Sequence, residues 1–327
     1  MQTLSSLKHQ AVRDLAWSCF GPNIVEHFPG AGKGLNGAVQ SCPITLTNRR
    51  QQWLLQLDQN PTLLLNHLAC LKSTRLGLYF EALWQFFIQQ DEQLELIAHN
   101  LRVYREKVTL GEFDILYRDL ATDEIFHLEL AIKYYLNCST TVLNRDQHFS
   151  TAYKYWVGPN TIDRLDKKLA HLLNHQIELS ALQESTGVLE KCGIKNTEGK
   201  SINKVIALKG MLFYPHNVAA DCRFEANTAN ERLSNNHLHG EWIHLEEFIE
   251  RCDAYTYWCH LQKPRWISPP TYSCVEDLIS AENLAEHMGD YFSHTTRPAM
   301  ICAMREDSGS MQEVRRYFVT ANSWPSK

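Results

Sequence analysis

The chain has 327 residues, of which 44% are hydrophobic and 21% charged, and its formal net charge is −5 at pH 7. This composition predicts a globular protein with a sizeable core, and no run of eighteen apolar residues is present to form a transmembrane helix. The negative charge argues against a protein that is basic over its whole surface. We therefore expect a cytoplasmic chain that does not bind membranes, since its first residues also lack the apolar stretch of a secretory signal. The sequence leaves the oligomeric state open.

Helices are predicted first along the chain. Residues 1–20 carry apolar side chains at helical spacing, and residues 51–70 read as helical segments on either side of Pro61. The segment 74–90, TRLGLYFEALWQFFIQQ, shows the strongest 3, 4 spacing of apolar residues. Between them, residues 21–43 are rich in Gly and Pro and are expected to form a loop. Their GAGKG stretch lacks the spacing of a phosphate-binding loop.

Three strands, a helix and a strand are expected next. The strands cover 94–104, 109–118 and 124–134, with a hairpin turn at 121–124. An amphipathic helix follows over 159–178, and then a strand over 203–215. Beyond 216 we expect a strand at 238–245 and helices at 246–258 and 275–288. The predicted organisation is a helical extension (1–73), a core (74–215) and an α+β region (216–327).

Charged side chains interrupt two of the apolar strand runs. The stretch GEFDILYRDLATDEIFHLELAIK (111–133) places Asp114, Glu129 and Lys133 where a charge costs several kcal/mol unless it is compensated. Alternate residues of a strand share a face, so Glu129 and Lys133 lie on one face of the second strand. If Asp114 points to the same place, the two carboxylates can hold one divalent cation.

Such a group has the chemistry needed to cleave a phosphodiester bond. A magnesium or manganese ion held by Asp114 and Glu129 makes a bound water more acidic and neutralises the charge that develops on the phosphate. The ammonium of Lys133 adds electrostatic stabilisation. The residues alone leave other roles open: Asp114 pairing with Arg118, or Glu129 and Lys133 forming a structural salt bridge.

These residues resemble a known nuclease superfamily. GEFD, followed by a hairpin and an E-x-A-x-K run, is similar to the motif of the PD-(D/E)XK nucleases, which have the restriction-endonuclease-like fold. The order helix, three strands, helix, strand is similar as well. More narrowly, the segments GLYFEALWQFF, GEFDILYRD, HLELAIKYYL and WVGPNTIDRLDKKLAHLLNHQ resemble DUF1853, a bacterial family. The narrower resemblance covers about 10–270, and the nuclease-like one about 74–215.

The resemblance implies roles for single residues. Asp114 matches the metal-binding aspartate, Glu129 matches the acidic member of the E-x-K motif, and Glu81 resembles the helix carboxylate that completes the metal site. The usual lysine position is Ala131 here, and Lys133 stands one pleat further along the same face. A mixed α/β protein with a restriction-endonuclease-like core, acting on nucleic acid with magnesium or manganese, is therefore the leading expectation. The alternative is a catalytically degenerate protein that keeps the fold and binds nucleic acid or protein.

Two lysines on the predicted helix 159–178 are candidates for substrate contact. Lys167 and Lys168 could bind phosphates through their charge. Read by themselves, they also fit the solvated face of an amphipathic helix.

Overall fold

The computed structural model describes residues 6–25, 28, 39–142, 149–194, 201–218 and 233–325. The GAGKG stretch lies outside these ranges. The chain is a mixed α/β protein with a large mixed sheet, and it divides into two compact units. Unit 1 comprises Met1–Ile132, Lys167–Lys209 and Arg232–Ser234, and unit 2 comprises Lys133–Asp166, Gly210–Glu231 and Asn235–Lys327. Among the described helices, none has the length and apolar content needed to cross a bilayer.

Four helices open unit 1, and the sequence accounts for where they begin and end. They are α1 (Gln10–Phe20), α2 (Asn48–Gln59), α3 (Thr62–Ala69) and α4 (Leu76–Gln90). The hydroxyl of Thr47 accepts from the Arg50 N–H and caps α2, as serine and threonine do at helix starts. Pro61 precedes α3 because it cannot continue α2. The helices predicted at 51–70 and 74–90 are confirmed, while the one predicted over 1–20 is observed from Gln10 to Phe20, and residues 1–5 lie outside the described residues.

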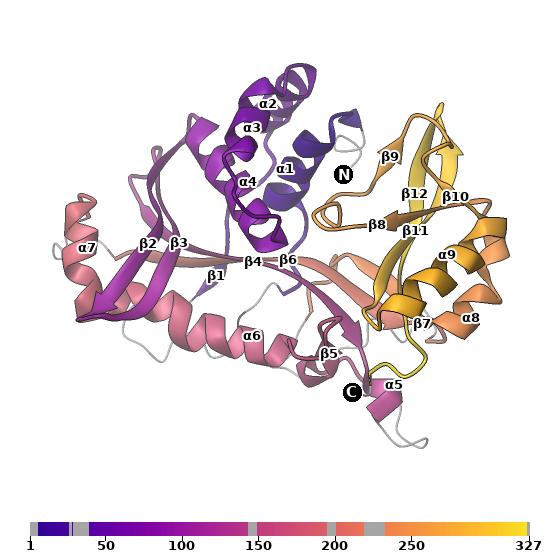
Figure 1. Cartoon of the computed structure of the whole chain (residues 1–327). Helices are drawn as coiled ribbons and strands as arrows, with labels where there is room; N and C mark the ends of the chain where they lie inside the picture. The colour runs from indigo at the N-terminus through magenta and orange to yellow at the C-terminus, as the bar shows by residue number, and fades with distance from the viewer. Residues whose placement is uncertain are drawn as a thin grey trace. The chain divides into compact units, whose positions relative to one another are not determined.

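Helix α4 is apolar on most of its surface, so it forms a buried layer rather than a solvent-facing helix. It contacts α1, α3, β2 and β3. Its buried residues are Leu76, Phe80, Ala82, Leu83, Trp84, Phe86, Phe87 and Ile88. Within unit 1, Figure 1 shows α1–α4 on one side of strands β2–β4, and α6 with the turns that follow it on the other. A sheet with helices on both faces results.

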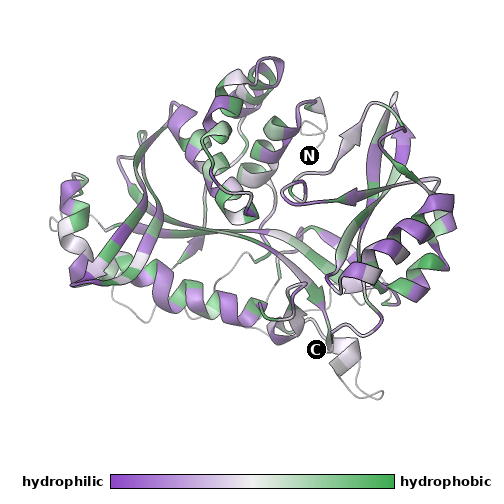
Figure 2. Ribbon diagram, in the orientation of Figure 1, coloured by the Kyte–Doolittle hydropathy of each residue, from purple (hydrophilic) through white to green (hydrophobic). Residues whose placement is uncertain are grey.

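The three predicted strands form an antiparallel meander. They are β2 (Leu94–Arg105), β3 (Val108–Asp119) and β4 (Ile125–Asn137). The carboxylate of Asp119 accepts from the N–H groups of Ala121 and Thr122 and closes the turn between β3 and β4. Figure 2 shows β4 as a largely apolar ribbon, in keeping with a strand that is covered on both faces.

Strands β3 and β4 pair over only part of their length. Their register runs from Arg118↔Ile125 to Ile115↔Leu128. Beyond that pair β3 continues to pair with β2, down to Val108, while β4 continues to Asn137. The two strands therefore diverge at Asp114 and Glu129, the residues that would form the next pair. We call this point the fork.

The helix predicted over 159–178 begins later and is not uniformly α-helical. It consists of α6 (Leu165–His171), a π-helical turn η3 (Leu172–Gln176) and a 3-10 turn η4 (Ile177–Ala181). The Asn160 side chain accepts from the N–H groups of Ile162 and Asp163, and this local turn delays the helix start. The short helix α7 (Thr186–Lys191) follows, and then β6 (Asn203–Pro215), which matches the predicted strand.

The order helix, three strands, helix, strand is thus observed as α4, β2, β3, β4, α6 and β6. Shorter elements intervene: α5 (Ser139–Val142), β5 (Trp156–Val157) and α7. A two-residue strand β1 (Gln40–Ser41) pairs in parallel with β6. The division at 73/74 and 215/216 stays a prediction.

Unit 2 contains a hairpin that the sequence analysis did not predict, formed by β11 (Ala299–Asp307) and β12 (Ser310–Thr320). Strand β8 (Tyr257–Leu261) pairs with β11, and β7 (His239–His244) pairs in parallel with β12. The remaining elements are α8 (Leu245–Ile249), β9 (Thr271–Tyr272), β10 (Ile279–Ser280) and α9 (Ala281–His294). The predicted helix 246–258 is correct only at its start: α8 ends at Ile249, a 3-10 turn follows at Cys252–Ala254, and β8 begins at Tyr257.

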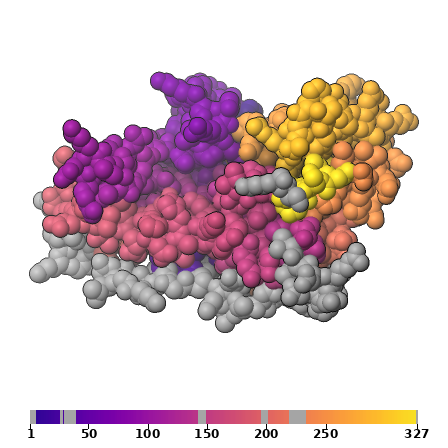
Figure 3. Space-filling model, turned by 60° about the horizontal axis from the view of Figure 1, so that its bottom comes forward, coloured from indigo at the N-terminus to yellow at the C-terminus, as the bar shows by residue number. Residues whose placement is uncertain are grey.

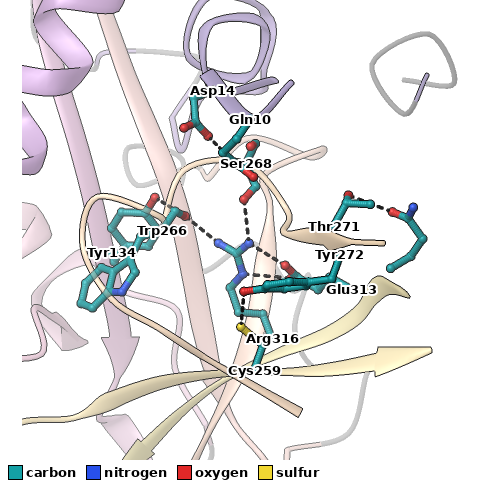
Figure 4. Close-up of polar contacts among 11 residues, drawn as sticks. Gln10, Asp14, Tyr134, Cys259, Trp266, Ser268, Thr271, Tyr272, Glu313 and Arg316 are labelled. Carbon is teal, nitrogen blue, oxygen red and sulfur yellow. Dashed lines mark hydrogen bonds and ion pairs between the residues drawn. The ribbon is translucent and has the colours of Figure 1, made fainter. Parts of the chain in front are cut away.

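A buried arginine fixes the loop between β8 and β9 in unit 2 (Figure 4). Arg316 pairs with Glu313 at 2.6 Å and donates to the backbone oxygen of Trp266 at 2.6 Å. Tyr134 donates to the same oxygen at 2.8 Å. Because a buried charge is tolerated only when it is paired and hydrogen-bonded, these contacts explain how an arginine lies inside a strand.

Candidate functional site

The fork in unit 1 brings carboxyl groups from two strands together. The side chain of Asp114 accepts from the Leu130 N–H at 2.8 Å. It thereby supplies the acceptor that a backbone carbonyl would supply if the ladder continued. The two carboxyl groups are close enough for the charge of Glu129 to raise the pKa of Asp114. Asp114 and Glu129 therefore lie next to each other, as expected from the sequence. Their chemical role stays a prediction.

Glu129 is completely buried and is held by two polar side chains. Gln176, at the end of the π-helical turn, donates to Oε2 at 2.7 Å. The Nε2 atom of His127, two residues earlier on β4, lies 2.8 Å from Oε1. Burial lowers the pKa of His127 to about 3, so its imidazole is neutral at physiological pH. The Glu129 carboxyl is thus fixed in orientation by neutral groups.

The third carboxyl group comes from helix α4. Glu81 accepts from the Asn100 amide at 3.5 Å, and the same amide donates to Glu112 at 3.0 Å. Gln85 on α4 holds the amide oxygen of Asn100 at 2.8 Å. Asn100 therefore links the helix carboxyl to strand β3.

A backbone irregularity places Asn100 at this point. It adopts a left-handed φ of 49°, which asparagine tolerates better than most residues. It stands between the pairs His99↔Ile115 and Leu101↔Phe113, opposite Asp114. Phe113 and Leu116, three residues apart, belong to the same buried cluster, which strict alternation does not allow. The regular alternation of faces is therefore broken where Asp114 lies, next to both Glu81 and Glu129.

All three carboxyl groups have raised pKa values. Burial raises the pKa of Asp114 to about 8, and the nearby charge of Glu129 adds to this. Burial also raises the pKa of Glu129 to about 8. The pKa of Glu81 rises to about 7 through burial and the charge of Asp114. Like charges in a water-poor place disfavour ionisation, so these carboxyl groups hold their protons to a higher pH than usual.

One ammonium group acts on all three carboxyl groups, and it belongs to Lys168. Its charge lowers the pKa values of Glu129, Asp114 and Glu81, against the effect of burial. Lys168 is partly buried on α6 and donates to the Gln176 amide oxygen at 3.0 Å. The sequence analysis assigned this lysine to substrate contact together with Lys167, which is exposed.

Lys133 is engaged elsewhere. It belongs to unit 2, where its ammonium forms an ion pair with the carboxylate of Asp163. Tyr135 donates to the other oxygen of that carboxylate at 3.4 Å. The role of Lys133 as the charge-stabilising residue stays a prediction. The ammonium group that acts on the carboxyl groups of unit 1 is that of Lys168.

Sequence reasoning missed His127, Asn100 and Gln176. The sequence did contain a signal for His127: it stands two positions before Glu129 in the same strand, and residues two apart in a strand share a face. Gln176 carried none, since its contact depends on a π-helical turn that brings it to a residue 47 positions away. Such turns occur frequently at functional sites.

Oxygen donors of this kind suit magnesium, manganese or calcium rather than zinc. In the part of the chain that the structure describes, no three His, Cys, Asp or Glu side chains are already arranged as a metal-ligand set. Binding of a cation would have to displace the protons that the raised pKa values favour, and it would have to draw the carboxylates together. The donor chemistry fits a hard divalent ion.

Comparison with known proteins places the chain in a family. Neither the curated proteins nor the solved structures contain a match to it. The model of the domain of unknown function DUF1853 matches residues 13–320. This match covers both units and includes the fork with all of its polar side chains, and the chain therefore belongs to the DUF1853 family.

Proposed function

We propose that the protein is a metal-dependent phosphodiesterase acting on nucleic acid, with a restriction-endonuclease-like core and its active site at the fork of β3 and β4. The observation that carries the proposal is the gathering of Asp114, Glu129 and Glu81 from three elements. Their pKa values are raised to about 8, 8 and 7. Strongly shifted carboxyl groups that share one partly buried place are typical of functional sites.

Each side chain at the fork has a distinct part in this proposal. Asp114 and Glu129 bind a magnesium or manganese ion, and Glu81 completes the set from α4. When bound, the ion supplies a more acidic water and neutralises charge on the scissile phosphate. Lys168 stabilises the negative charge that builds up in the transition state, in the place that the superfamily motif gives to a strand lysine. Gln176 and His127 would hold the Glu129 carboxylate in a fixed orientation through its two oxygens.

The burial of the fork also supports this assignment. Glu129 is fully buried, and Asp114 is partly buried. In such surroundings one positive charge has a larger effect than it has in water. A cation that binds there would replace the protons that these carboxyl groups hold because of their raised pKa values.

The second candidate is a non-catalytic protein that keeps the fold and binds nucleic acid or protein. Two observations favour it: Ala131 occupies the usual lysine position, and Lys133 is paired with Asp163. This candidate predicts binding that does not depend on a divalent ion.

A cleavage assay separates the two candidates. Purified protein would be incubated with manganese or magnesium and with labelled single-stranded, duplex and branched DNA and RNA. We expect cleavage by the parent, its loss in Asp114→Asn and Glu129→Gln, and its retention in Lys133→Met. Absence of cleavage by the parent on every substrate, or activity equal to the parent in Asp114→Asn, contradicts the enzymatic proposal.

A further inference from the structure

A strip of side chains leads away from the fork along one face of the β2–β3 hairpin, half-buried at Asn100 and Glu112 and exposed at Arg102 and Tyr104. We infer that this strip, which we call the hairpin strip and define as Asn100, Arg102 and Tyr104 on β2 with Glu112 on β3, binds a single-stranded segment of nucleic acid. Arg102 contacts a phosphate there, and Tyr104 stacks on a base. The inference rests on the proposed function, because it says which form of nucleic acid, single-stranded rather than duplex, reaches the carboxyl groups of the fork.

The hairpin strip is continuous with the site. The Asn100 amide, which contacts Glu81, donates to Glu112 Oε1 at 3.0 Å. Arg102 Nε donates to the other oxygen of Glu112 at 2.7 Å. Tyr104 stands two residues after Arg102, at the next exposed position on that face of β2. From Asn100 to Tyr104 the strip extends about 13 Å along the strand.

The exposure of these side chains leaves them open to a ligand. Arg102 forms an ion pair with Glu112, and its side chain is 62% exposed. Tyr104 is 49% exposed. An ion pair this exposed adds little to stability, so the guanidinium can exchange Glu112 for a phosphate at small cost. β2 is the last strand in the order of the sheet. A chain can therefore follow the hairpin without displacing another strand.

Charge and ring chemistry together identify the occupant. The exposed charged residues at the end of the hairpin are Arg102, Arg105, Glu106 and Lys107. Three of the four are basic, and these three can contact a phosphate backbone. Arg105 pairs with Glu184 of the turn before α7 at 2.6 Å, and Figure 3 shows the hairpin beside the α6–α7 segment. A tyrosine ring stacks on a base only when that base is not stacked inside a duplex. A single-stranded segment satisfies both side chains, while a duplex would meet only the arginine.

Fluorescence anisotropy tests this inference without requiring cleavage. The probe is a fluorescein-labelled oligothymidine of about twenty nucleotides, compared with a duplex of the same length, with calcium in place of magnesium. We expect tighter binding of the single strand, and about 5- to 100-fold weaker binding in Tyr104→Ala. Tyr104→Phe retains the ring and should remain within about two-fold of the parent, because stacking does not need the hydroxyl.

The salt dependence of binding tests the arginine. Removing one phosphate contact in Arg102→Ala should lower the slope of log K against log salt by about 0.7. The matched control is Arg118→Ala, which removes an arginine at the opposite end of the same hairpin that pairs with Glu95 and Asp123. That variant should keep the slope of the parent. Melting temperatures check that every variant is folded.

Failure of this inference is distinct from failure of the catalytic proposal. Equal binding by Tyr104→Ala and parent, a preference for duplex, or no binding of the oligonucleotide overturns the inference, even if cleavage occurs. Ring-dependent binding of the single strand supports it, even if no cleavage is seen, and only the catalytic proposal is then lost.

Discussion

Asp114→Asn should stabilise the protein in the absence of metal, although it removes a proposed ligand. Asparagine has nearly the shape of a protonated aspartate and keeps an oxygen for the Leu130 N–H, which lies 2.8 Å from the carboxylate. It cannot ionise, so it ends the repulsion between this position and Glu129. A site built for function often costs stability in this way.

The size of the effect follows from the pKa. Folding raises the pKa of Asp114 from its ordinary value of 3.8 to about 8. A carboxyl group with a raised pKa favours the folded state at low pH, and this contribution is lost as the pH rises from about 4 to 8. A difference of about 4 in pKa corresponds to a ceiling of about 6 kcal/mol. Relaxation and water entry reduce such costs, so we expect about 2 kcal/mol at pH 8, or roughly 3 °C in Tm for a chain of this length.

Thermal unfolding in metal-free buffer at about pH 5.5 and 8.5 provides the assay. The advantage of Asp114→Asn over the parent should grow with pH. The matched control is Glu95→Gln, which removes a carboxylate of the same hairpin. Glu95 forms an ion pair with Arg118, and its side chain is 53% exposed. This control should change the free energy of unfolding by less than about 1 kcal/mol. An asparagine variant that is less stable than the parent at both pH values refutes the reasoning.

Three further predictions concern metal, lysines and packing. The rise in Tm caused by manganese should increase between about pH 6 and 8, because the ion competes with the protons of the carboxyl groups; a shift that is equal at both pH values would contradict a site at the fork. Lys168→Met should lower the free energy of unfolding more at pH 8 than at pH 5.5, whereas Lys133→Met should cost no more than about 1 kcal/mol at either pH. Urea titrations at the two pH values measure both variants. If their losses of stability depend on pH in the same way, Lys168 is not the ammonium that acts on the carboxyl groups of the fork. Gly240→Ala should destabilise unit 2 by about 1–3 kcal/mol, because the new methyl carbon would stand 2.6 Å from the Arg316 backbone oxygen; chemical denaturation that shows no loss would contradict this packing.

The elements around the fork were predictable because short-range patterns determine them. Helix α4 followed from apolar spacing, and the meander of β2, β3 and β4 followed from apolar runs separated by a turn. The charges of Asp114 and Glu129 inside those runs marked the fork itself, since an uncompensated charge is costly in an apolar strand. The side chains that hold the fork together depend on tertiary contacts. Gln176 reaches Glu129 only through a π-helical turn.

The β11–β12 hairpin shows why other parts escaped prediction. Arg315 and Arg316 stand side by side in β12 and interrupt its apolar pattern. The structure accommodates Arg316 in a buried position by pairing it with Glu313 and with the backbone oxygen of Trp266. Trp266 lies 50 positions away in the sequence, and no local pattern signals such a compensation. In the same way, the left-handed Asn100 depends on Gln85 from α4, and not on its neighbours in β2 alone.

The most direct test of the central proposal is a crystal structure of the protein soaked in manganese, with anomalous diffraction recorded to locate the ion. We expect one strong anomalous peak at the fork, within coordination distance of carboxylate oxygens of both Asp114 and Glu129, and its loss in Asp114→Asn. A fork without a peak at saturating manganese, or an ion bound only elsewhere, would contradict the account.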